Sequence, residues 1–203
     1  MNPLRIIRAT LFILFLCLTT APVGSAGGSD DWMGEIKALV QKKDWKGLRD
    51  APRKNNTLET LKLDGMGLGN DGAIAVAEGV KENKQLRQLS LEDNGIGNIG
   101  GEALGEFLGD NKTLVKLDLE GNNIRSDGVI DIALALAKHP TLQVLELDNN
   151  LIDDVGALML AKGLAKNTSL TKLDLEGNKI SEEVKAKLRE AVKGRDGFKL
   201  EFE

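Results

Sequence analysis

Residues Leu114–Ile124 read LVKLDLEGNNI, and this phrase recurs along the chain with a 28-residue period. Its skeleton is L-x-x-L-x-L-x-x-N-x-I. Three further complete copies begin at Leu86, Leu142 and Leu170, and a degenerate copy begins at Leu58. In the degenerate copy Met66 takes the place of the asparagine. Five copies in register indicate a repeat architecture, in which each unit buries its leucine face against its neighbours.

The repeat resembles the leucine-rich repeat family, whose units are about 20–29 residues long. Five units fill residues 56–195, namely 56–83, 84–111, 112–139, 140–167 and 168–195. After its asparagine each unit has a second apolar block with helical spacing, as at Ile132 and Leu136. Such 28-residue units with a full helix are similar to the ribonuclease-inhibitor-like class. That resemblance implies an α/β solenoid, a curved right-handed stack with a parallel sheet on the concave face and helices on the convex face.

The segments on either side of the five units are expected to cap the stack. Residues 27–55 are interpreted as an N-terminal helical cap with a degenerate half-repeat, in which Trp45 falls in the column of Ala73. Residues 196–203 are interpreted as a capping strand, because Phe198, Leu200 and Phe202 alternate with charged residues. Such a strand would cover the last edge of the sheet.

Recurring positions in the helical block predict how each helix is held. Small residues are expected to let each helix lie close to the strand behind it, at Ala77, Gly105, Ala133 and Ala161. N-cap acceptors are expected at the helix starts, at Asn70, Asn98, Ser126 and Asp154. His139 replaces an asparagine near a helix end, where we expect a C-terminal cap favourable to the helix dipole.

The first 26 residues are interpreted as a secretory signal peptide. Arg5 and Arg8 give a basic start, Leu11–Leu18 is an unbroken apolar run, and small residues follow as far as Ala26. The alternative is an uncleaved membrane anchor, although the apolar run is short of the roughly 20 residues that a spanning helix needs. Cleavage would remove two arginines and change the net charge from −4 to −6. The chain is expected to be exported, either secreted or periplasmic in a Gram-negative bacterium, with no stable membrane insertion after cleavage.

Composition excludes several classes of function. One Cys and one His among 203 residues cannot build a disulfide framework or a Cys- or His-rich metal site within one chain. The net charge of −4 argues against a general nucleic-acid-binding protein. The sequence has no P-loop, no dinucleotide-binding glycine motif and no Ser-His-Asp set. We therefore expect no enzymatic activity, no cofactor and no resident metal.

Two sets of asparagines recur with the repeat. The first set closes the leucine phrase and is expected to be structural, with amides that satisfy backbone groups: Asn94, Asn122, Asn150 and Asn178. The second set forms N-x-T or N-x-S sequons near helix ends, at Asn55, Asn111 and Asn167. These would be glycosylation acceptors in a secreted eukaryotic chain. Alternatively the repeat consensus alone generates them, because they recur at the same position of every second unit.

The strand positions that flank the inner leucines should face away from the helices, because side chains alternate along a strand. The position after the second inner leucine is acidic in every unit: Asp64, Glu92, Glu120, Asp148 and Glu176. The position between the two leucines holds Lys62, Ser90, Asp118, Glu146 and Asp174. Like charges on neighbouring strands repel each other by about 1 kcal/mol in water and by more near a protein surface. Lys116 and Lys172 should offset part of that repulsion.

Three interpretations of this acidic concave face remain open. It could receive a basic protein partner, it could hold a divalent cation through oxygen ligands, or it could be a solvated surface that keeps the sheet soluble. The sequence favours an exported protein–protein interaction module that binds a macromolecule across this face, with a basic partner as one such macromolecule. The alternative is a structural or cell-envelope-associated repeat protein with no discrete partner site. The oligomeric state does not follow from the sequence.

Overall fold

The computed structural model describes residues 29–55 and 57–202. The predicted signal peptide, residues 1–26, lies outside the described residues, so export remains a prediction. The chain divides into two compact units at Glu35, inside α2 (Ser29–Gln41). The first unit is described from Ser29 onward, and the second, from Ile36, carries all the later helices and strands. No helix in the described ranges is long and apolar enough to cross a membrane.

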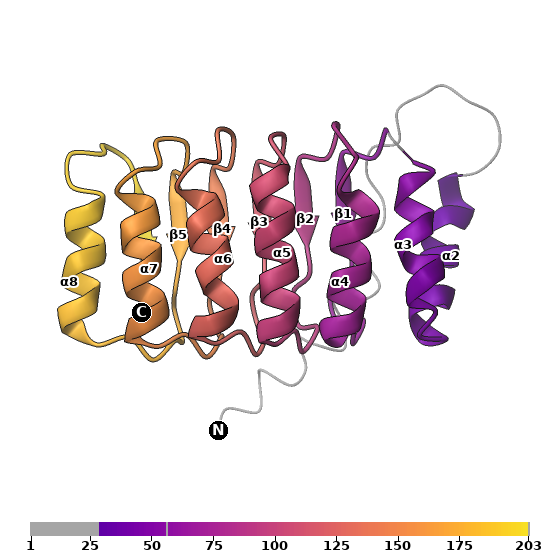
Figure 1. Ribbon diagram of the computed structural model, residues 1–203, viewed down its shortest axis with the longest axis horizontal. Helices are drawn as coiled ribbons and strands as arrows, with labels where there is room; N and C mark the ends of the chain where they lie inside the picture. The colour runs from indigo at the N-terminus through magenta and orange to yellow at the C-terminus, as the bar shows by residue number, and fades with distance from the viewer. Residues whose placement is uncertain (1–28, 56, 203) are drawn as a thin grey trace. The chain divides into compact units, whose positions relative to one another are not determined.

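In the second unit strands and helices alternate along the chain. The strands are β1 (Thr60–Lys62), β2 (Gln88–Ser90), β3 (Lys116–Asp118), β4 (Val144–Glu146), β5 (Lys172–Asp174) and β6 (Lys199–Glu201). The helices are α3 (Trp45–Arg53), α4 (Gly69–Val80), α5 (Asn98–Asp110), α6 (Ser126–Leu136), α7 (Asp154–Leu164) and α8 (Glu182–Ala191). The strands form one parallel sheet in chain order, and Figure 1 shows the helices as a single row on one side of it. The predicted α/β solenoid is confirmed.

The register of the sheet follows the repeat. Leu117 pairs with Leu89 on one side and with Leu145 on the other, so each step between these strands is one repeat unit. All three leucines are completely buried against the helices. Complete burial of one leucine side chain contributes roughly 1.5–3 kcal/mol, so this leucine ladder makes a large contribution to stability.

The C-terminal edge of the sheet departs from this register. Lys199 in β6 pairs with Lys172 in β5, a step one residue shorter than the repeat unit, and β6 covers the outer edge of β5. The Phe202 ring then lies against α8, with the Arg189 guanidinium 5.2 Å from the ring centroid. This cation–π contact joins the last strand to the last helix.

The asparagines that close the leucine phrase tie successive units together. In Asn122, Nδ2 donates to the carbonyls of Leu91 (3.0 Å) and Leu119 (2.9 Å), and Oδ1 accepts from the Ile96 N–H at 2.9 Å. One side chain therefore satisfies backbone groups of its own unit and of the preceding one. The same bridging pattern occurs at Asn94, Asn150 and Asn178.

One of the predicted small residues in the helices, Gly105, serves a different contact from the one expected. A Cβ on Gly105 of α5 would lie 2.6 Å from the backbone nitrogen of Ile132 in α6. On Gly128 of α6, a Cβ would lie 2.7 Å from the Cα of Asn98 in α5. Gly105 therefore allows neighbouring helices to approach each other, and the expected role in helix–strand packing is wrong for this residue.

The predicted N-cap residues also act on a different helix. α5, α6 and α7 begin at Asn98, Ser126 and Asp154 themselves. The Ser126 hydroxyl accepts from the N–H of Gly156 in α7 at 3.0 Å, and Asn70 Oδ1 accepts from the N–H of Gly100 in α5 at 3.1 Å. The preceding unit thus supplies a capping acceptor, because adjacent helices lie close enough for a short polar side chain to reach across. In α7 this acceptor acts beside Asp153, whose carboxylate accepts from the Val155 N–H at 2.9 Å.

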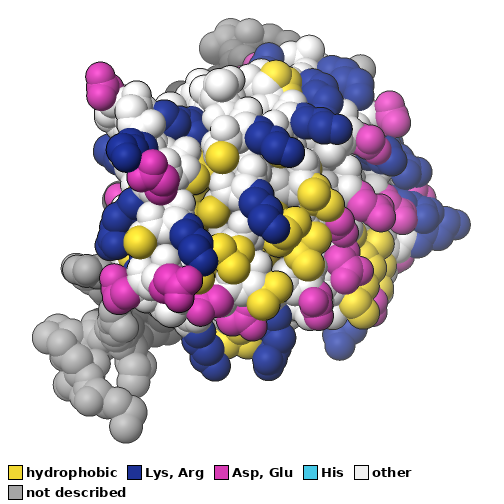
Figure 2. Space-filling model, turned by 60° about the vertical axis from the view of Figure 1, so that its left-hand side comes forward, with side chains coloured by type: hydrophobic (Ala, Val, Ile, Leu, Met, Phe, Trp, Pro, Cys, Tyr) yellow, Lys and Arg dark blue, Asp and Glu magenta, His cyan; other side chains and the backbone are white. Residues whose placement is uncertain are grey.

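Side chains on the helical side are not uniformly polar. Figure 2 shows hydrophobic side chains exposed among acidic and basic ones on the face that it presents. The large hydrophobic residues that are most exposed among the described residues are Ile99, Leu134 and Val155.

Candidate functional site

The candidate site is the sheet face, defined as the side of the six-stranded sheet opposite the helices. Because the inner leucines point toward the helices, the residues that flank them point to this face. The strand register places Asp118 beside Glu146, Glu146 beside Asp174, and Asp174 beside Glu201. We call these four residues the inner acidic column. Glu201 was not among the predicted site residues, because its alignment depends on the shortened step from β5 to β6.

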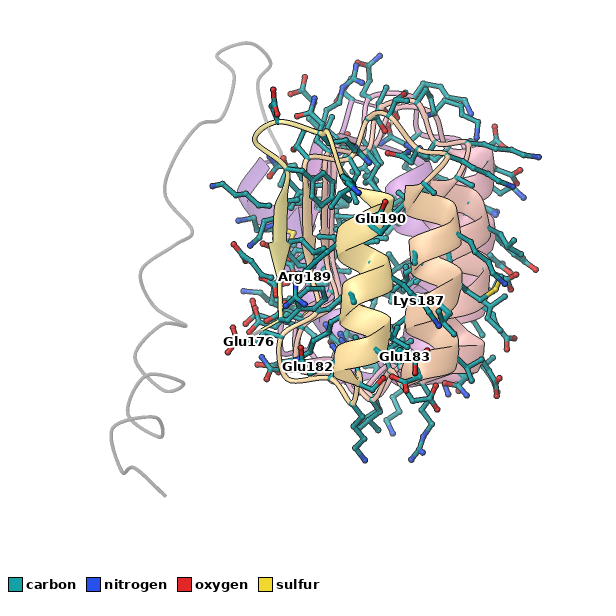
Figure 3. All side chains as sticks on the ribbon, turned by 90° about the vertical axis from the view of Figure 1, so that its left-hand side faces the viewer. Glu176, Glu182, Glu183, Lys187, Arg189 and Glu190 are labelled. Carbon is teal, nitrogen blue, oxygen red and sulfur yellow. The ribbon has the colours of Figure 1, made fainter. Side chains whose placement is uncertain are left out.

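A second line of carboxylates follows the ends of the strands. We call it the outer acidic column: Asp64, Glu92, Glu120, Asp148 and Glu176. Backbone hydrogen bonds continue the ladder here, since the Gly121 N–H donates to the Asp148 carbonyl at 3.1 Å and the Asn149 N–H to the Glu176 carbonyl at 2.7 Å. The chain then turns through a left-handed residue, with φ +69° at Gly121 and +53° at Asn149. Figure 3 shows Glu176 on the strand side of the last unit.

Lys172 neutralises one half of the inner acidic column. Its Nζ lies 3.2 Å from Asp174 Oδ2, 3.3 Å from Glu146 Oε1 and 3.0 Å from Glu201 Oε2. Burial opposes ionisation of Asp174, but hydrogen bonds with Glu201 and the Glu176 N–H, together with the Lys172 ion pair, outweigh it, so the pKa of the Asp174 carboxyl is lowered. One ammonium therefore holds carboxylates from three adjacent strands.

Lys116 neutralises the other half. Its Nζ lies 3.2 Å from Asp118 Oδ2 and also forms an ion pair with Glu146. The prediction that Lys116 and Lys172 offset part of the repulsion agrees with these distances. Both lysines pair with the inner column only.

Asp118 and Glu146 ionise unequally. Burial, and next the neighbouring Glu146, raise the pKa of Asp118 to about 6. Burial also opposes ionisation of Glu146, but hydrogen bonding with Asp118 and the two lysines outweighs it, so the pKa of Glu146 is lowered. In mildly acidic solution a protonated Asp118 can therefore donate to an ionised Glu146.

The outer acidic column has no such compensation. None of its five carboxylates forms an ion pair with a described residue. Burial raises the pKa of Asp148 to about 7, with Glu120 and Asp174 adding repulsion. Burial and neighbouring carboxylates also raise the pKa values of Glu92 and Glu120. The column is therefore a strip of negative potential that no described cation offsets.

Asp64 at the N-terminal end of the outer column has a neutral partner. It accepts from the Ser90 hydroxyl at 2.5 Å and from the Glu92 N–H at 3.2 Å. These bonds orient the carboxylate without reducing its charge.

Metal-binding geometry gives no support to the cation interpretation. Among the described side chains, no group of three or more His, Cys, Asp or Glu residues is arranged to hold a metal ion. The carboxylates of the sheet face are spread along two lines rather than gathered around a point.

The sequon asparagines are largely enclosed. The Nδ2 atom of Asn111 is buried, and that of Asn167 donates to the carbonyls of Leu136 (2.8 Å) and His139 (3.1 Å). A glycan attaches to this nitrogen, so either modification would require the loop to open. Asn55 is half-buried.

His139 occupies the position that Asn111 and Asn167 hold in the units before and after it. Its Nδ1 accepts from the Leu142 N–H at 3.0 Å, as asparagine Oδ1 does elsewhere in the column. Burial, and next the nearby Lys112, lower the pKa of His139 to about 4. The imidazole is therefore neutral at physiological pH, and the expected favourable interaction of a charged histidine with the helix dipole is wrong.

Comparison with known families agrees with the repeat pattern. The family described as Leucine Rich repeat matches residues 54–77, 82–105, 110–133, 138–161 and 166–183, which together make up more than half of the chain. This chain belongs to the leucine-rich repeat family. Its 28-residue units, each with a strand and a full helix, are of the ribonuclease-inhibitor-like class.

Two solved structures share the fold of this leucine-rich repeat chain. The structure titled "Leiomodin-1 Actin-Binding Site 2 (ABS2)" is 21% identical, with a TM-score of 0.57 over 82% of this chain and 87% of that one. The tropomodulin C-terminal domain of Caenorhabditis elegans is 16% identical, with a TM-score of 0.60 over 73% of this chain and 91% of that one. No curated protein matched the sequence. At these identities the likeness establishes the fold alone.

Proposed function

We propose that this leucine-rich repeat protein is an exported protein–protein interaction module whose sheet face binds a basic segment of a partner protein. The observation that carries the proposal is the outer acidic column, which lacks ion pairs with described residues although the adjacent inner column is paired with two lysines. The unpaired carboxylates of the outer column are therefore available to pair with basic side chains of a partner protein.

The raised pKa values of the outer column indicate that a cationic partner would be favoured there. Burial, together with repulsion from neighbouring carboxylates, opposes ionisation of Glu92, Glu120 and Asp148. A lysine or arginine of a partner would favour the ionised carboxylates, so binding would release protons near neutral pH. Each contact between opposite charges at about 4 Å contributes roughly 1 kcal/mol in water and more where the surface is partly desolvated.

The fold supports a macromolecular rather than a small-molecule ligand. The sheet face presents two lines of carboxylates across successive strands, which suits an extended basic segment. The leiomodin structure, by its title, comprises an actin-binding site. It supports the general use of this fold for binding proteins, and the identity of that partner is not transferred to this chain.

Export is the second part of the proposal and rests on Arg5, Arg8 and the apolar run Leu11–Leu18. Intact-mass analysis of released protein should give a chain that begins near Gly27. A full-length mass in the soluble extracellular or periplasmic fraction would contradict the signal-peptide interpretation.

Affinity capture from the native extracellular or periplasmic fluid tests the binding proposal. Three baits are used: the wild-type protein, the double variant Glu120→Gln with Asp148→Asn, and a control double variant. The matched control, Glu183→Gln with Glu190→Gln, makes the same charge change on α8, as Figure 3 shows. We expect a salt-sensitive protein partner that the control retains and the sheet-face variant loses. Equal capture by all three baits, or retention of the protein only in the insoluble cell envelope, would contradict the proposal.

A further inference from the structure

The outward faces of α5, α6 and α7 have features of an interface. Ile99 on α5, Leu134 on α6 and Val155 on α7 are 59%, 55% and 60% exposed. Single exposed apolar residues are ordinary, but three on adjacent helices are a reason to consider a contact surface.

One row of side chains across these helices changes from acidic to apolar to basic. Glu106 on α5, Leu134 on α6 and Lys162 on α7 occupy the same position of three successive units, and all three are exposed. Neither charged residue forms an ion pair with a described residue. Among the described residues, the one hydrogen-bond contact of the Lys162 ammonium is with the Met159 sulfur, at 3.9 Å. We call Glu106, Leu134 and Lys162 the central row.

A second row crosses the first turns of the same helices. Ile99, Asp127 and Val155 share one position of their units, so this row is apolar at both ends and acidic in the middle. All three side chains are exposed. We call them the first-turn row.

The two rows can be tested for fit against a second copy of the chain. The three helices run in the same direction, because each follows a strand of one parallel sheet. A two-fold axis parallel to α6 would set α6 against α6 of the second copy and α5 against α7, with equal heights along the helices facing each other. The central row is self-complementary under this rotation, because each Glu106 then meets a Lys162 and the two Leu134 side chains meet at the axis.

The first-turn row gives a mixed contribution under the same rotation. Each Ile99 meets a Val155, so two apolar contacts form. Asp127 faces its own counterpart, and like charges at about 4 Å repel by roughly 1 kcal/mol in water. The two Glu106–Lys162 pairs have the opposite sign and act twice, so the charges of these two rows together favour the contact.

The surface shape allows the two leucines to interlock. A hollow of about 280 Å³ lies between α5 and α6, where Gly105 and Gly109 provide no side chains and Leu134 lines the wall. Leu134 of the second copy would approach α6 directly beside this hollow. A small sideways shift would let it enter, and the symmetry gives the same fit to the other copy.

We propose that the outward faces of α5, α6 and α7 form a two-fold symmetric contact with a second copy of this chain. The contact uses neither acidic column, so it leaves the sheet faces of both copies available. It is limited to three helices in each copy, and contacts of this extent give weak, concentration-dependent dimers.

Sedimentation equilibrium of the purified protein over a range of concentrations tests the proposal. We expect the average mass of the wild type to rise toward that of a dimer at low salt, and less so at high salt. Leu134→Asp places a charge at the centre of the contact and should weaken self-association by about tenfold or more. Circular dichroism should show that this variant is folded, since the side chain it replaces is exposed.

Two single charge reversals that should restore binding when the variants are mixed test the proposal independently of folding defects. Glu106→Lys and Lys162→Glu should each be monomeric alone, because like charges then face each other in the homodimer. Fluorescently labelled Glu106→Lys should bind unlabelled Lys162→Glu, since both pairs of opposite charges are restored in the heterodimer. The control titrates the same labelled variant with Lys193→Glu, which has the same net charge but is altered beyond the end of α8.

Fluorescence-detected sedimentation follows only the labelled chain. The self-association of unlabelled Lys193→Glu is measured separately and is included when its affinity for the labelled chain is fitted. We expect Lys162→Glu to bind it several-fold more tightly than Lys193→Glu does. A wild type that is monomeric at every concentration, or equal binding of the labelled chain to the two titrants, would overturn the proposal.

Discussion

Asp118 and Glu146 are direct neighbours in the β3–β4 register, yet the pKa of Asp118 is raised to about 6 whereas the pKa of Glu146 is lowered. The difference arises first because Asp118 is the more buried of the two, and because the hydrogen bond between them favours the ionised Glu146. Glu146 also contacts both Lys116 and Lys172, whereas Asp118 contacts Lys116 alone. The two lysines together pair with all four carboxylates of the inner column. The outer column, two residues further along each unit, has no lysine and is the better candidate for an external cation.

Asp148→Asn should stabilise the protein at alkaline pH. The folded-state pKa of Asp148, about 7, exceeds the unfolded value near 3.8. Its contribution to stability is therefore complete below about pH 4 and is lost as pH rises through 7. The variant should gain about 1 kcal/mol over the wild type at pH 8, a figure discounted for the solvent exposure of this side chain. Urea unfolding at pH 8 and pH 4 measures this, and an equal difference at both pH values would show that ionisation of Asp148 is not the cause.

Leu117→Ala should be far more damaging than Asp118→Asn. Leu117 is fully buried in the leucine ladder, where such a change typically costs about 2–5 kcal/mol. Asp118 is also largely covered, with 8% of it exposed, but its neighbours on the sheet face can hydrogen-bond an amide of the same shape. Thermal melts of both variants check the strand register, and comparable losses in Tm would mean that it is incorrect.

Ser126→Ala should weaken the contact between the third and fourth units. The hydroxyl accepts from Gly156 N–H in α7 and is hydrogen-bonded to Asp153, so its loss leaves the start of the next helix without that acceptor. We expect a loss of about 1 kcal/mol. Native-state hydrogen exchange should locate the change in the first turn of α7. Faster exchange confined to the first turn of α6 would instead support a cap within its own helix.

His139→Asn should reduce the sensitivity of the fold to acid. The folded-state pKa of His139 is about 4, below the ordinary value of 6.5, so the unfolded chain takes up this proton first as pH falls. The wild type should lose up to about 3 kcal/mol between pH 6.5 and pH 4 from this group, and the variant should not. Unfolding free energies of both proteins across that range provide the check. Parallel curves would show that the imidazole is not held neutral.

The repeat pattern was sufficient to predict the fold because residues one repeat unit apart pair with each other in β2, β3 and β4. Leu117 pairs with Leu89 and Leu145, which are the same leucine of the neighbouring phrases. The two acidic columns could be predicted for the same reason. The sequence could not show that Ser126 caps α7 rather than α6, because that depends on the distance between helices.

Two features of the sheet face depend on three-dimensional structure. Glu201 enters the inner acidic column because the step from β5 to β6 is one residue shorter than the repeat unit, which the repeat itself does not predict. Lys172 holds Glu146, Asp174 and Glu201 together, and these contacts depend on the direction of a flexible side chain. The contrast between a paired inner column and an unpaired outer one therefore appears only in the structure.

The most direct test of the central claim is the association rate of the captured partner with wild type and with Glu120→Gln plus Asp148→Asn, measured by stopped flow at low and high salt. Electrostatic steering acts mainly on the association rate and is screened by salt. We expect the sheet-face variant to associate several-fold more slowly at low salt, with the difference disappearing at high salt, and the control Glu183→Gln plus Glu190→Gln to behave like wild type. Equal rates for all three proteins at low salt would contradict the claim that the outer acidic column binds the partner.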